Sequence, residues 1–258
     1  MLSLKDYLDM EFKGIDMSNG LEPALEKYVG TDSLHKFLDL VCRLEDAWGS
    51  MILPSECVEQ AEEDIYNFYY SNDLITKILN CSSRHEDELI MKFVAENGLK
   101  NGNTLVDFGC GCGVKTGYYA MMGKDVTGVD RLSSAIKLLN ERKYKYKISN
   151  LKSVQANLVN IDMVEMFDIA LATNMLHECG DNAIVSYCCE RKMPKKINNI
   201  YRCLNKNGIF IATVKAFEIS DIEYDILDNM SSAGFGNIER KEIAKYEDVT
   251  ILGFTGRK

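Results

Sequence analysis

The sequence is poor in the residues that bind metal ions or interrupt a chain. It contains only 3 prolines and 3 histidines among 258 residues, and no Cys-x-x-Cys pair. A structural zinc site needs such clustered cysteine and histidine ligands. The 9 cysteines include the closely spaced pair Cys110 and Cys112, but small buried thiols are the commoner use of cysteine in a reduced protein. We therefore expect no metal ion and mostly buried, reduced cysteines.

Long hydrophobic runs are also missing. No run approaches the roughly 18–20 apolar residues that a membrane-spanning helix needs. The first residues mix charged side chains such as Lys5, Asp6 and Asp9 with apolar ones. They lack the uninterrupted apolar segment of a secretory signal peptide. These absences predict a cytoplasmic protein that does not enter a membrane.

Basic residues are fewer than acidic residues. The chain has 30 lysine and arginine residues against 39 aspartate and glutamate residues, a formal net charge of -9. Such a balance disfavours a general attraction for nucleic acid or for an anionic membrane. Hydrophobic residues at 46% and charged residues at 27% are ordinary for a folded globular chain. The length allows one large domain with an appended subdomain.

The first hundred residues have a helical pattern. Apolar residues recur at three- and four-residue spacing, for example at Leu34, Leu38 and Val41. Ser83 and Glu86 have the spacing of a capping box. The sequence predicts a helical N-terminal cap over residues 1–97, with the remaining residues 98–258 forming a separate core.

After residue 100, short apolar segments alternate with helical ones. This order is typical of βαβ units, and it predicts a doubly wound, mostly parallel sheet covered by helices on both faces. The last two segments are joined by a short polar connection, so we expect an antiparallel pair there. The expected strands are Thr104–Phe108, Asp125–Val129, Ser153–Asn157, Phe167–Thr173, Ile209–Val214, Asn237–Ile243 and Val249–Phe254.

The first strand-to-helix turn carries the clearest chemical signal. The expected strand at residues 104–108 runs into Gly109, Gly111 and Gly113. Glycines at such a turn allow a tight bend and close approach of a ligand to the backbone. The next strand ends at Asp130, about 20 residues further on, the spacing expected of an acid that binds ribose hydroxyls. The turn therefore predicts a nucleoside-containing cofactor.

A nicotinamide dinucleotide is one candidate cofactor. Its fingerprint is G-x-G-x-x-G, with pyrophosphate at the helix N-terminus, whereas this chain reads G-x-G-x-G. Asp107 directly before the first glycine would repel phosphate and would suit a cation. A nucleoside with a positively charged tail fits better, and an oxidoreductase remains the alternative.

Residues 107–113 resemble motif I of the class I S-adenosylmethionine-dependent methyltransferases, commonly D-x-G-C-G-x-G. The resemblance extends from about Phe93 to the C-terminus. The strand to Asp130, the fourth-strand segment with Asn174 and the turn at 204–208 are similar to further motifs of the family. The sequence departs from the pattern at Leu132, where serine is common, and at Asn157, where an acid is usual.

The resemblance implies a Rossmann-like, seven-stranded sheet with an antiparallel last strand. It implies S-adenosyl-L-methionine as cofactor and S-adenosyl-L-homocysteine as product. Asp107 would place the ammonium group, Asp130 would bind the ribose, and Asn174 would lie near the sulfonium. The full set of implied cofactor-binding residues is Asp107, Phe108, Gly109, Cys110, Gly111, Gly113, Asp130, Arg131, Asn157, Leu158 and Asn174.

The residues that would bind the molecule accepting the methyl group are less clearly indicated by the sequence. His177 is the candidate for a general base or for orienting the substrate, and it is equally compatible with a residue that packs at a helix start. Glu178 beside it also suits a helix N-terminus. The tyrosines Tyr66, Tyr69 and Tyr70 loosely resemble a segment that closes over the cofactor in fatty-acyl cyclopropane synthases. We expect the N-terminal helices to form a lid that excludes water.

The resemblance predicts methyl transfer to a small or medium-sized metabolite. A non-catalytic cofactor-binding module that regulates or scaffolds a partner is the alternative, as is a peptide or protein acceptor. The residues between 178 and 196 are expected to form a long loop that faces the substrate or a partner. Its basic stretch, residues 191–196, is interpreted as a solvated surface.

Overall fold

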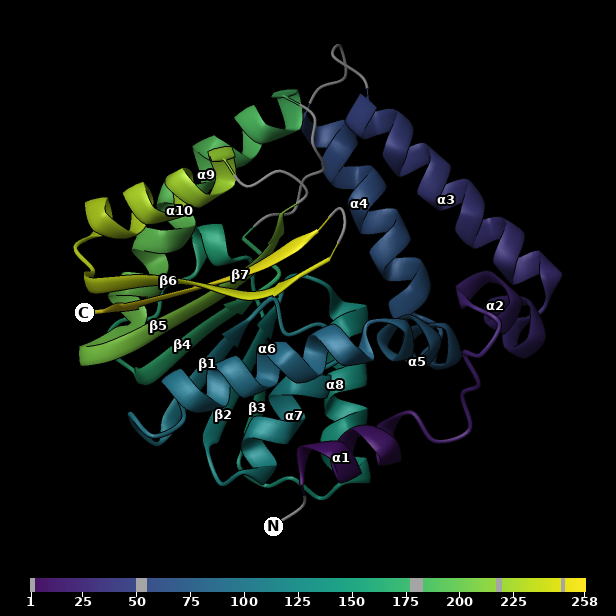
Figure 1. The fold of residues 1–258 in the computed structure, drawn as a ribbon, viewed down its shortest axis with the longest axis horizontal. Coiled ribbons are helices and arrows are strands. Elements are labelled where there is room, and N and C mark those ends of the chain that lie inside the picture. Colours follow the sequence, from purple (N-terminus) through teal and green to yellow (C-terminus); the bar gives the residue numbers. More distant parts are fainter. Residues whose placement is uncertain (1–2, 50–54, 177–182, 217–219, 247–248) are drawn as a thin grey trace.

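The computed structural model describes residues 3–49, 55–176, 183–216, 220–246 and 249–258. A seven-stranded sheet lies at its centre, with strand order β3-β2-β1-β4-β5-β7-β6 and helices on both faces (Figure 1). The first five strands run parallel, and β7 pairs antiparallel with β5 and β6. The strands are β1 (Thr104–Phe108), β2 (Asp125–Asp130), β3 (Leu151–Gln155), β4 (Phe167–Thr173), β5 (Leu204–Ala216), β6 (Gly236–Lys245) and β7 (Thr250–Arg257). The predicted Rossmann-like sheet with an antiparallel last strand is confirmed.

The helices fall into an N-terminal group and a group between the strands. Six helices precede β1 in the described part of the chain: α1 (Leu4–Glu11), α2 (Leu21–Val29), α3 (Thr31–Gly49), α4 (Ser55–Tyr70), α5 (Asp73–Ser82) and α6 (Arg84–Asn97). The others are α7 (Val114–Met121), α8 (Ser133–Lys145), the short 3₁₀ helix η1 (Leu158–Asn160), α9 (Ala183–Cys203) and α10 (Ser220–Ala233).

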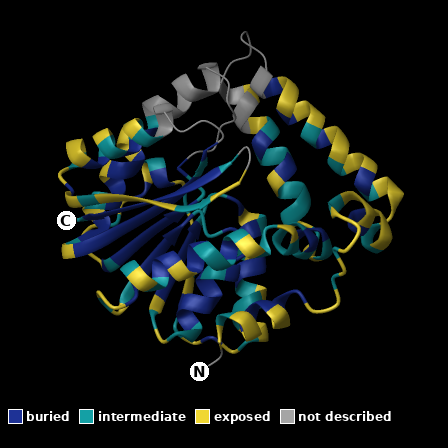
Figure 2. Ribbon diagram, viewed as in Figure 1, coloured by how far each residue is buried: buried dark blue, intermediate teal, exposed yellow. Residues whose placement is uncertain are grey.

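The central strands are buried on both faces, as Figure 2 shows. Four of the five β1 residues and six of the seven β4 residues are buried, which is expected where helices cover both sides of a parallel sheet. On one face, β-strand side chains pack against α9 and α10 through residues such as Ile197 and Met230. On the other face they pack against α1, α6, α7 and α8, with Tyr7, Val94 and Tyr119 in the same cluster.

The N-terminal helices pack in two ways, some against the sheet and others against one another. Helices α1 and α6 contribute Leu8, Met91 and Phe93 to the apolar cluster beneath the sheet. Helices α2 to α5 bury their apolar faces mainly against one another, around Leu25 and Ile75. The division into a cap over residues 1–97 and a core over residues 98–258 stays a prediction.

Only β1 and β4 have the bounds expected from the sequence; the other five strands differ, among them β3 and β5. β3 ends at Gln155, so Asn157 lies beyond the strand and caps η1 instead. β5 begins at Leu204 rather than Ile209. The residues predicted as a turn are drawn into β5 because Leu204 pairs with Phe167, with a register shift before Ile169.

The predicted loop at 178–196 is wrong for residues 183–196, which belong to α9; residues 177–182 lie outside the described part. Met193, Ile197 and Ile200 recur at helical spacing and are buried against the sheet. Tertiary burial of this face outweighs the helix-breaking tendency of Pro194, which lies inside the helix.

Asp168 joins three strands at the end of the sheet opposite the glycine turn. Its Oδ2 accepts hydrogen bonds from Asn103 N at 2.9 Å, Thr104 N at 3.1 Å and Thr104 Oγ1 at 3.0 Å, and its Oδ1 accepts from Asn205 Nδ2 at 2.9 Å. Burial raises the pKa of this carboxyl, but these hydrogen bonds lower it further than burial raises it. The side chain is therefore a structural link among β1, β4 and β5.

We expect Asp168→Ala to lower the free energy of unfolding by about 2–4 kcal/mol, because hydrogen bonds to a charged group are lost together. Urea denaturation measures this loss. The control is Asp162→Ala, whose side chain is 84% exposed and pairs only at the surface with Arg202; such pairs contribute about 0–1 kcal/mol. Equal losses in the two variants would contradict the structural role of Asp168.

Candidate functional site

The glycine turn between β1 and α7 is held against the end of β2. The backbone N–H groups of Gly109 and Cys110 both donate to Val129 O, at 2.8 and 3.1 Å. Gly109 and Gly111 have φ of 68° and 53°, a region that side chains disfavour. A Cβ at Gly109 would lie 2.7 Å from the Cβ of Met175, and one at Gly111 would lie 2.6 Å from the Tyr70 hydroxyl oxygen. The turn therefore presents bare backbone to its surroundings.

Asp130 stands at the end of β2, as predicted, and ties the glycine turn to that strand. Its Oδ2 accepts a hydrogen bond from Gly111 N at 2.9 Å, and its Oδ1 accepts from Leu132 N at 3.0 Å. A carboxylate offers about four acceptor positions, so this fixed side chain has the capacity to bind hydroxyl groups as well.

Asp107 lies behind the turn and is only 1% exposed. Its Oδ2 accepts a hydrogen bond from Thr116 Oγ1 at 2.6 Å, while its buried Oδ1 has no hydrogen-bond partner among the described residues. Burial raises the pKa of this carboxyl to about 6, although the Thr116 hydroxyl and the nearby Lys115 lower it. A buried oxygen without a donor is costly, so the arrangement is suited to a ligand that brings a donor or a positive charge.

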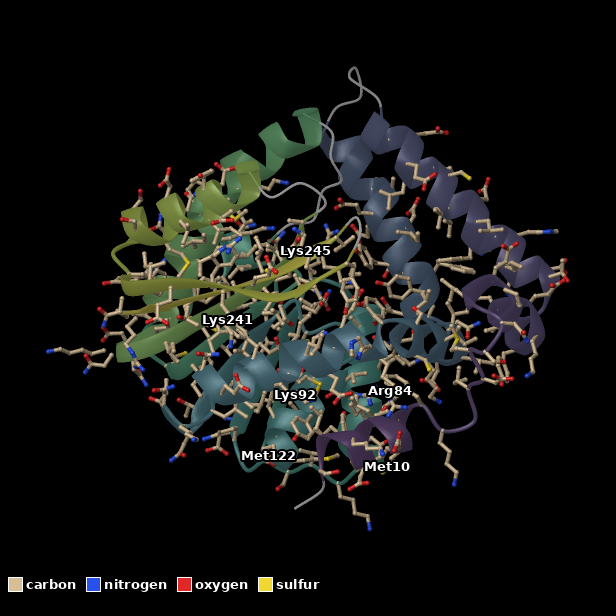
Figure 3. All side chains as sticks on the ribbon, viewed as in Figure 1. Met10, Arg84, Lys92, Met122, Lys241 and Lys245 are labelled. Atoms are coloured by element: carbon tan, nitrogen blue, oxygen red, sulfur yellow. The ribbon has the colours of Figure 1, made fainter. Side chains whose placement is uncertain are left out.

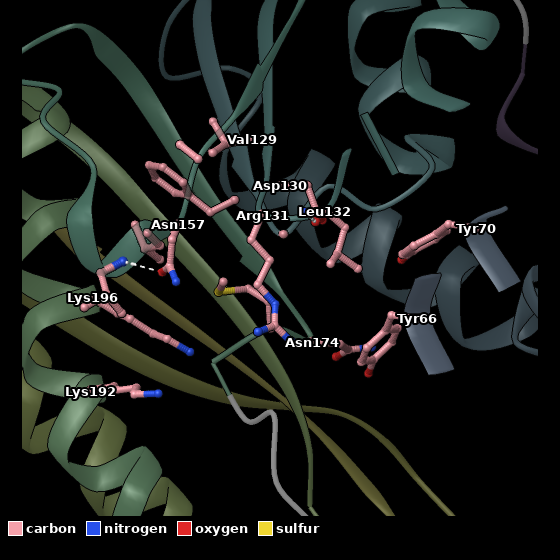
Figure 4. Close-up of a pocket in the computed structure, with 16 residues that line it drawn as sticks. Tyr66, Tyr70, Val129, Asp130, Arg131, Leu132, Asn157, Asn174, Lys192 and Lys196 are labelled. Atoms are coloured by element: carbon pink, nitrogen blue, oxygen red, sulfur yellow. Dashed lines mark hydrogen bonds between the residues drawn. The ribbon is translucent and has the colours of Figure 1, made fainter. Parts of the chain in front are cut away.

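A cavity of about 160 Å³ opens beside the turn, at the carboxyl ends of β1, β2 and β4 (Figure 4). Ligands of open α/β sheets bind at this edge. The predicted residues that line it are Tyr66, Tyr70, Phe108, Gly109, Asp130, Arg131, Asn157, Leu158 and Asn174. Residues that sequence reasoning missed also line it: Val129, Leu132, Ala156, Val159, Met175, Lys192 and Lys196.

Several predicted residues lie next to the cavity without lining it. Gly113 packs so closely on Leu139 that a Cβ would clash with the leucine side chain. Burial raises the pKa of the half-buried Cys110 thiol. The Tyr69 ring packs edge-on against Tyr70, with centroids 4.5 Å apart. These residues support the site from behind. The expectation of mostly buried cysteines is wrong for Cys42 and Cys57, which are exposed.

The two asparagines at the cavity are held in fixed orientations. Asn157 Oδ1 accepts a hydrogen bond from Val159 N at 3.0 Å and so caps η1. Asn174 has φ of 54°; its N–H donates to Thr213 O at 2.8 Å, and its Oδ1 accepts from Thr213 Oγ1 at 3.1 Å. Residues held in this sparsely populated backbone region cluster at functional sites.

Helix α4 brings two tyrosines to the cavity. The rings of Tyr66 and Tyr70 are stacked, 6.3 Å apart with 19° between their planes. Ser134 Oγ at the start of α8 donates to Asn67 Oδ1 at 2.7 Å. Arg131 pairs with Glu62 at 3.7 Å. Helix α4 is therefore anchored to the end of β2 and to α8, with the Tyr70 hydroxyl over Gly111 and Tyr66 at the cavity.

Two predicted residues, His177 and Glu178, lie outside the described residues, and their roles stay predictions. The solvated-surface interpretation of the basic stretch is wrong for Lys196, which is 5% exposed, and for the half-buried Lys192. Both face the cavity, whereas Lys195 is exposed. The four-residue spacing of these two lysines, in register with buried Met193 and Ile197, is the signal that could have revealed them.

Within the described ranges, no group of three or more histidine, cysteine, aspartate or glutamate side chains could hold a metal ion. Among the described helices, none is both long enough and apolar enough to cross a membrane.

Comparison with known sequences identifies a family. A family model described as "Methyltransferase domain" matches residues 99–243, more than half of the chain. The protein 235L of Invertebrate iridescent virus 6, which is named as a methyltransferase, is 26% identical over 174 residues. The match covers 60% of this chain and 62% of that protein, so it spans less than two thirds of the relative.

Comparison with solved structures supports the fold. A 1,6-didemethyltoxoflavin-N1-methyltransferase from Burkholderia thailandensis, solved with 1,6-didemethyltoxoflavin and S-adenosylhomocysteine, superposes with a TM-score of 0.60 at 18% identity, covering 81% of this chain and 92% of that chain. The [4+2]-cyclase SpnF superposes with a TM-score of 0.56 at 17% identity, covering 66% and 79%. These similarities establish a common architecture, which also hosts a reaction named differently from methyl transfer.

Proposed function

Because the chain belongs to the family of methyltransferase domains, we propose that it transfers the methyl group of S-adenosylmethionine to a small molecule. The observation that carries this proposal is the pair of carboxylates on either side of the glycine turn, Asp130 at the cavity and Asp107 buried behind it. In this proposal Asp130 binds hydroxyl groups and Asp107 binds a cation. The structure from Burkholderia thailandensis holds 1,6-didemethyltoxoflavin and S-adenosylhomocysteine, which supports the same proposal.

The residues that line the cavity, and Asp107 behind the glycine turn, fit this cofactor. Asp107 Oδ1 lacks a hydrogen-bond donor among the described residues, which an ammonium group would supply. Gly109 and Gly111 have no side chains of their own to obstruct the methionine portion. In this proposal Asp130 accepts from the ribose hydroxyls, and the segment that begins at Asn157 frames the adenine. Phe108, Arg131 and Leu158 complete the wall of this pocket.

When bound, S-adenosylmethionine supplies a methyl group on an electrophilic sulfonium. The protein's task is then to align the acceptor atom with that methyl group and to exclude water, with reacting atoms about 3–3.5 Å apart. We propose that Asn174 orients the reacting groups through its carboxamide, which Thr213 Oγ1 holds by a hydrogen bond. Tyr66 and Tyr70 cover the cavity from α4. His177 is proposed as the base that takes a proton when the acceptor arrives protonated.

A second reading is a module that binds the cofactor without transferring its methyl group. The fold similarity to a [4+2]-cyclase favours testing it, because fold alone does not fix the reaction. The two readings agree on cofactor binding and differ on turnover.

Calorimetric titration with S-adenosylmethionine, S-adenosylhomocysteine and NADH tests the proposal. We expect micromolar binding of the two sulfur compounds and none of NADH. Formation of S-adenosylhomocysteine in the presence of a pool of small metabolites then separates turnover from mere binding. NADH binding in preference to both sulfur compounds would refute the cofactor assignment.

Cofactor binding should depend on pH through Asp107. The pKa of about 6 means that the carboxylate is ionised at pH 7 and protonated at pH 5. Protonation removes its attraction for an ammonium group, so the affinity for S-adenosylhomocysteine should fall by about tenfold from pH 7 to pH 5. In the cofactor-free protein, Asp107 affects folding stability with the opposite dependence on pH. The raised pKa stabilises the folded state below pH 3.8, and this contribution is lost as pH rises through about 6.

Titration calorimetry at several pH values measures the effect. The matched control is Asp107→Asn, which cannot ionise and should bind weakly with little pH dependence. An affinity of the wild-type protein that stays constant from pH 5 to pH 7 would show that Asp107 does not bind the ammonium group.

A further inference from the structure

Helix α1 is linked to the glycine turn by a buried arginine. It lies beside α7 and α8 (Figure 1). Arg142 of α8 forms an ion pair through Nη1 with Glu11 Oε2 of α1, and its Nε donates a hydrogen bond to Cys112 O at 3.1 Å. The side chains of Arg142 and Glu11 are 12% and 2% exposed. Arg142 therefore connects the N-terminal helix to the backbone of the turn.

The ion pair fixes the place of the guanidinium group. A guanidinium is planar and has several N–H donors, so it bonds to a carboxylate and to a backbone carbonyl at the same time. A buried charge is costly unless it is paired, and Glu11 is the carboxylate that pairs with Arg142. Glu11 therefore keeps Arg142 within reach of Cys112 O.

Helix α1 also contacts the start of α7 directly. The hydroxyl of the buried Tyr7 donates to Val114 O at 2.6 Å. A Cβ at Gly117 of α7 would lie 3.0 Å from Arg142 Cδ and 3.3 Å from the Tyr7 hydroxyl oxygen. Glycine inside a helix is unfavourable compared with alanine. Here it leaves room for both side chains to pass close to α7.

The glycine turn is thus held from two sides. Beside the cavity, Gly111 N donates to Asp130 Oδ2 at 2.9 Å; on the other side, Arg142 bonds to the carbonyl of the next residue, Cys112. A shift of that carbonyl would move the Gly111 backbone, which the methionine portion of the cofactor contacts in the proposed function. Neither Arg142 nor Glu11 is among the described residues that line the cavity.

We propose that Arg142 and Glu11 are positioning residues for the cofactor. Through Cys112 O they hold the glycine turn in the conformation that binds S-adenosylmethionine, without touching the cofactor. The inference rests on the proposed function and adds the N-terminal helix α1 to the parts of the chain on which cofactor affinity depends.

Arg142→Met tests the role of the guanidinium, because methionine has no donor for Cys112 O. Titration calorimetry of the full chain with S-adenosylhomocysteine measures the affinity, and urea denaturation measures the stability. We expect the affinity to fall by about tenfold. We also expect a loss of stability, because Glu11 is left buried without its cation. Glu11→Gln alone leaves Arg142 in place and should lower the affinity by about threefold.

The double variant Glu11→Gln/Arg142→Met separates positioning from stability. It removes the unpaired carboxylate, so it should be more stable than Arg142→Met and supplies a folded protein where that variant does not. Its affinity for S-adenosylhomocysteine should stay about tenfold below that of the wild type, because Cys112 O still lacks its donor. A merely structural role predicts instead that affinity returns together with stability.

Two control variants should bind S-adenosylhomocysteine as the wild type does. Asp9→Asn changes the same helix at a surface ion pair with Arg84 of α6; Figure 3 labels Arg84 and, on α1, Met10. Asp168→Ala loses stability at the opposite end of the sheet. It therefore shows whether lost stability alone weakens cofactor binding.

The outcomes separate this inference from the proposed function. Failure of the wild-type protein to bind S-adenosylhomocysteine would overturn both. Wild-type binding with an equal affinity in Arg142→Met would overturn the positioning role alone. So would affinity that recovers with stability in the double variant, or an equal loss of affinity in Asp168→Ala. Unchanged affinity in Glu11→Gln would overturn the part assigned to α1.

Discussion

Asp130→Ala is expected to weaken the binding of S-adenosylmethionine by about 100-fold or more and to abolish methyl transfer at ordinary cofactor concentrations. Hydrogen bonds from ribose hydroxyls to a carboxylate contribute about 1.5–3 kcal/mol each, and two would be lost together. The substitution also removes the acceptor for Gly111 N and Leu132 N. The glycine turn would then lose its link to β2, which adds to the effect on binding.

Calorimetry on the purified variant measures the loss of affinity, and thermal denaturation shows whether the fold survives. Asp125→Ala is the matched control, because Asp125 is an exposed residue at the opposite end of the same strand. It should bind the cofactor as the wild type does. Affinity retained in Asp130→Ala would argue against the ribose-binding role of this carboxylate.

Gly109→Ala should reduce cofactor affinity by about 100-fold and destabilise the protein. Alanine at a φ of 68° is strained by about 1–2 kcal/mol. The new Cβ would also lie 2.7 Å from the Cβ of Met175, an atom close to the backbone that cannot swing away as a side-chain end can. Either the turn or the Met175 segment must shift, which moves the backbone that the methionine portion would contact; a misplacement of about 1 Å also costs on the order of 100-fold in reaction rate.

Gly123→Ala separates these two causes. Gly123 has φ of 87°, but a Cβ there would meet no atom within 4 Å. It should therefore show the backbone strain without the collision, losing stability by a comparable 1–2 kcal/mol while binding the cofactor normally. If Gly109→Ala binds the cofactor as well as Gly123→Ala does, close approach at Gly109 is not required for the site.

Much of the core could be predicted from the sequence. β1 and β4 have the bounds that the apolar segments indicated, because buried strands of a parallel sheet are continuous apolar runs. Asp130 was placed at a strand end by its spacing from the glycines. These features depend on residues near one another in the chain, where periodicity and turn chemistry act directly.

Errors arose where tertiary contacts outweighed local preference. The basic stretch before Pro194 has few signs of a buried helix, yet packing of Met193 and Ile197 against the sheet carries α9 through it. Leu204 joined β5 because Phe167 was available as a pairing partner. No pattern within the local sequence predicts that α9 packs against the sheet or that Leu204 pairs with Phe167.

The sequence by itself therefore determined the order of strands and helices, the glycine turn and the acids on its two sides, since these follow from composition and spacing within short segments. Only the tertiary structure decided which distant residues meet at the cavity. It placed the Tyr70 hydroxyl over Gly111 and brought Lys196 of α9 into the lining. It also left Asp107 Oδ1 buried without a donor among the described residues. Packing of elements far apart in the chain sets burial and contact, so these properties arise only once the chain is folded.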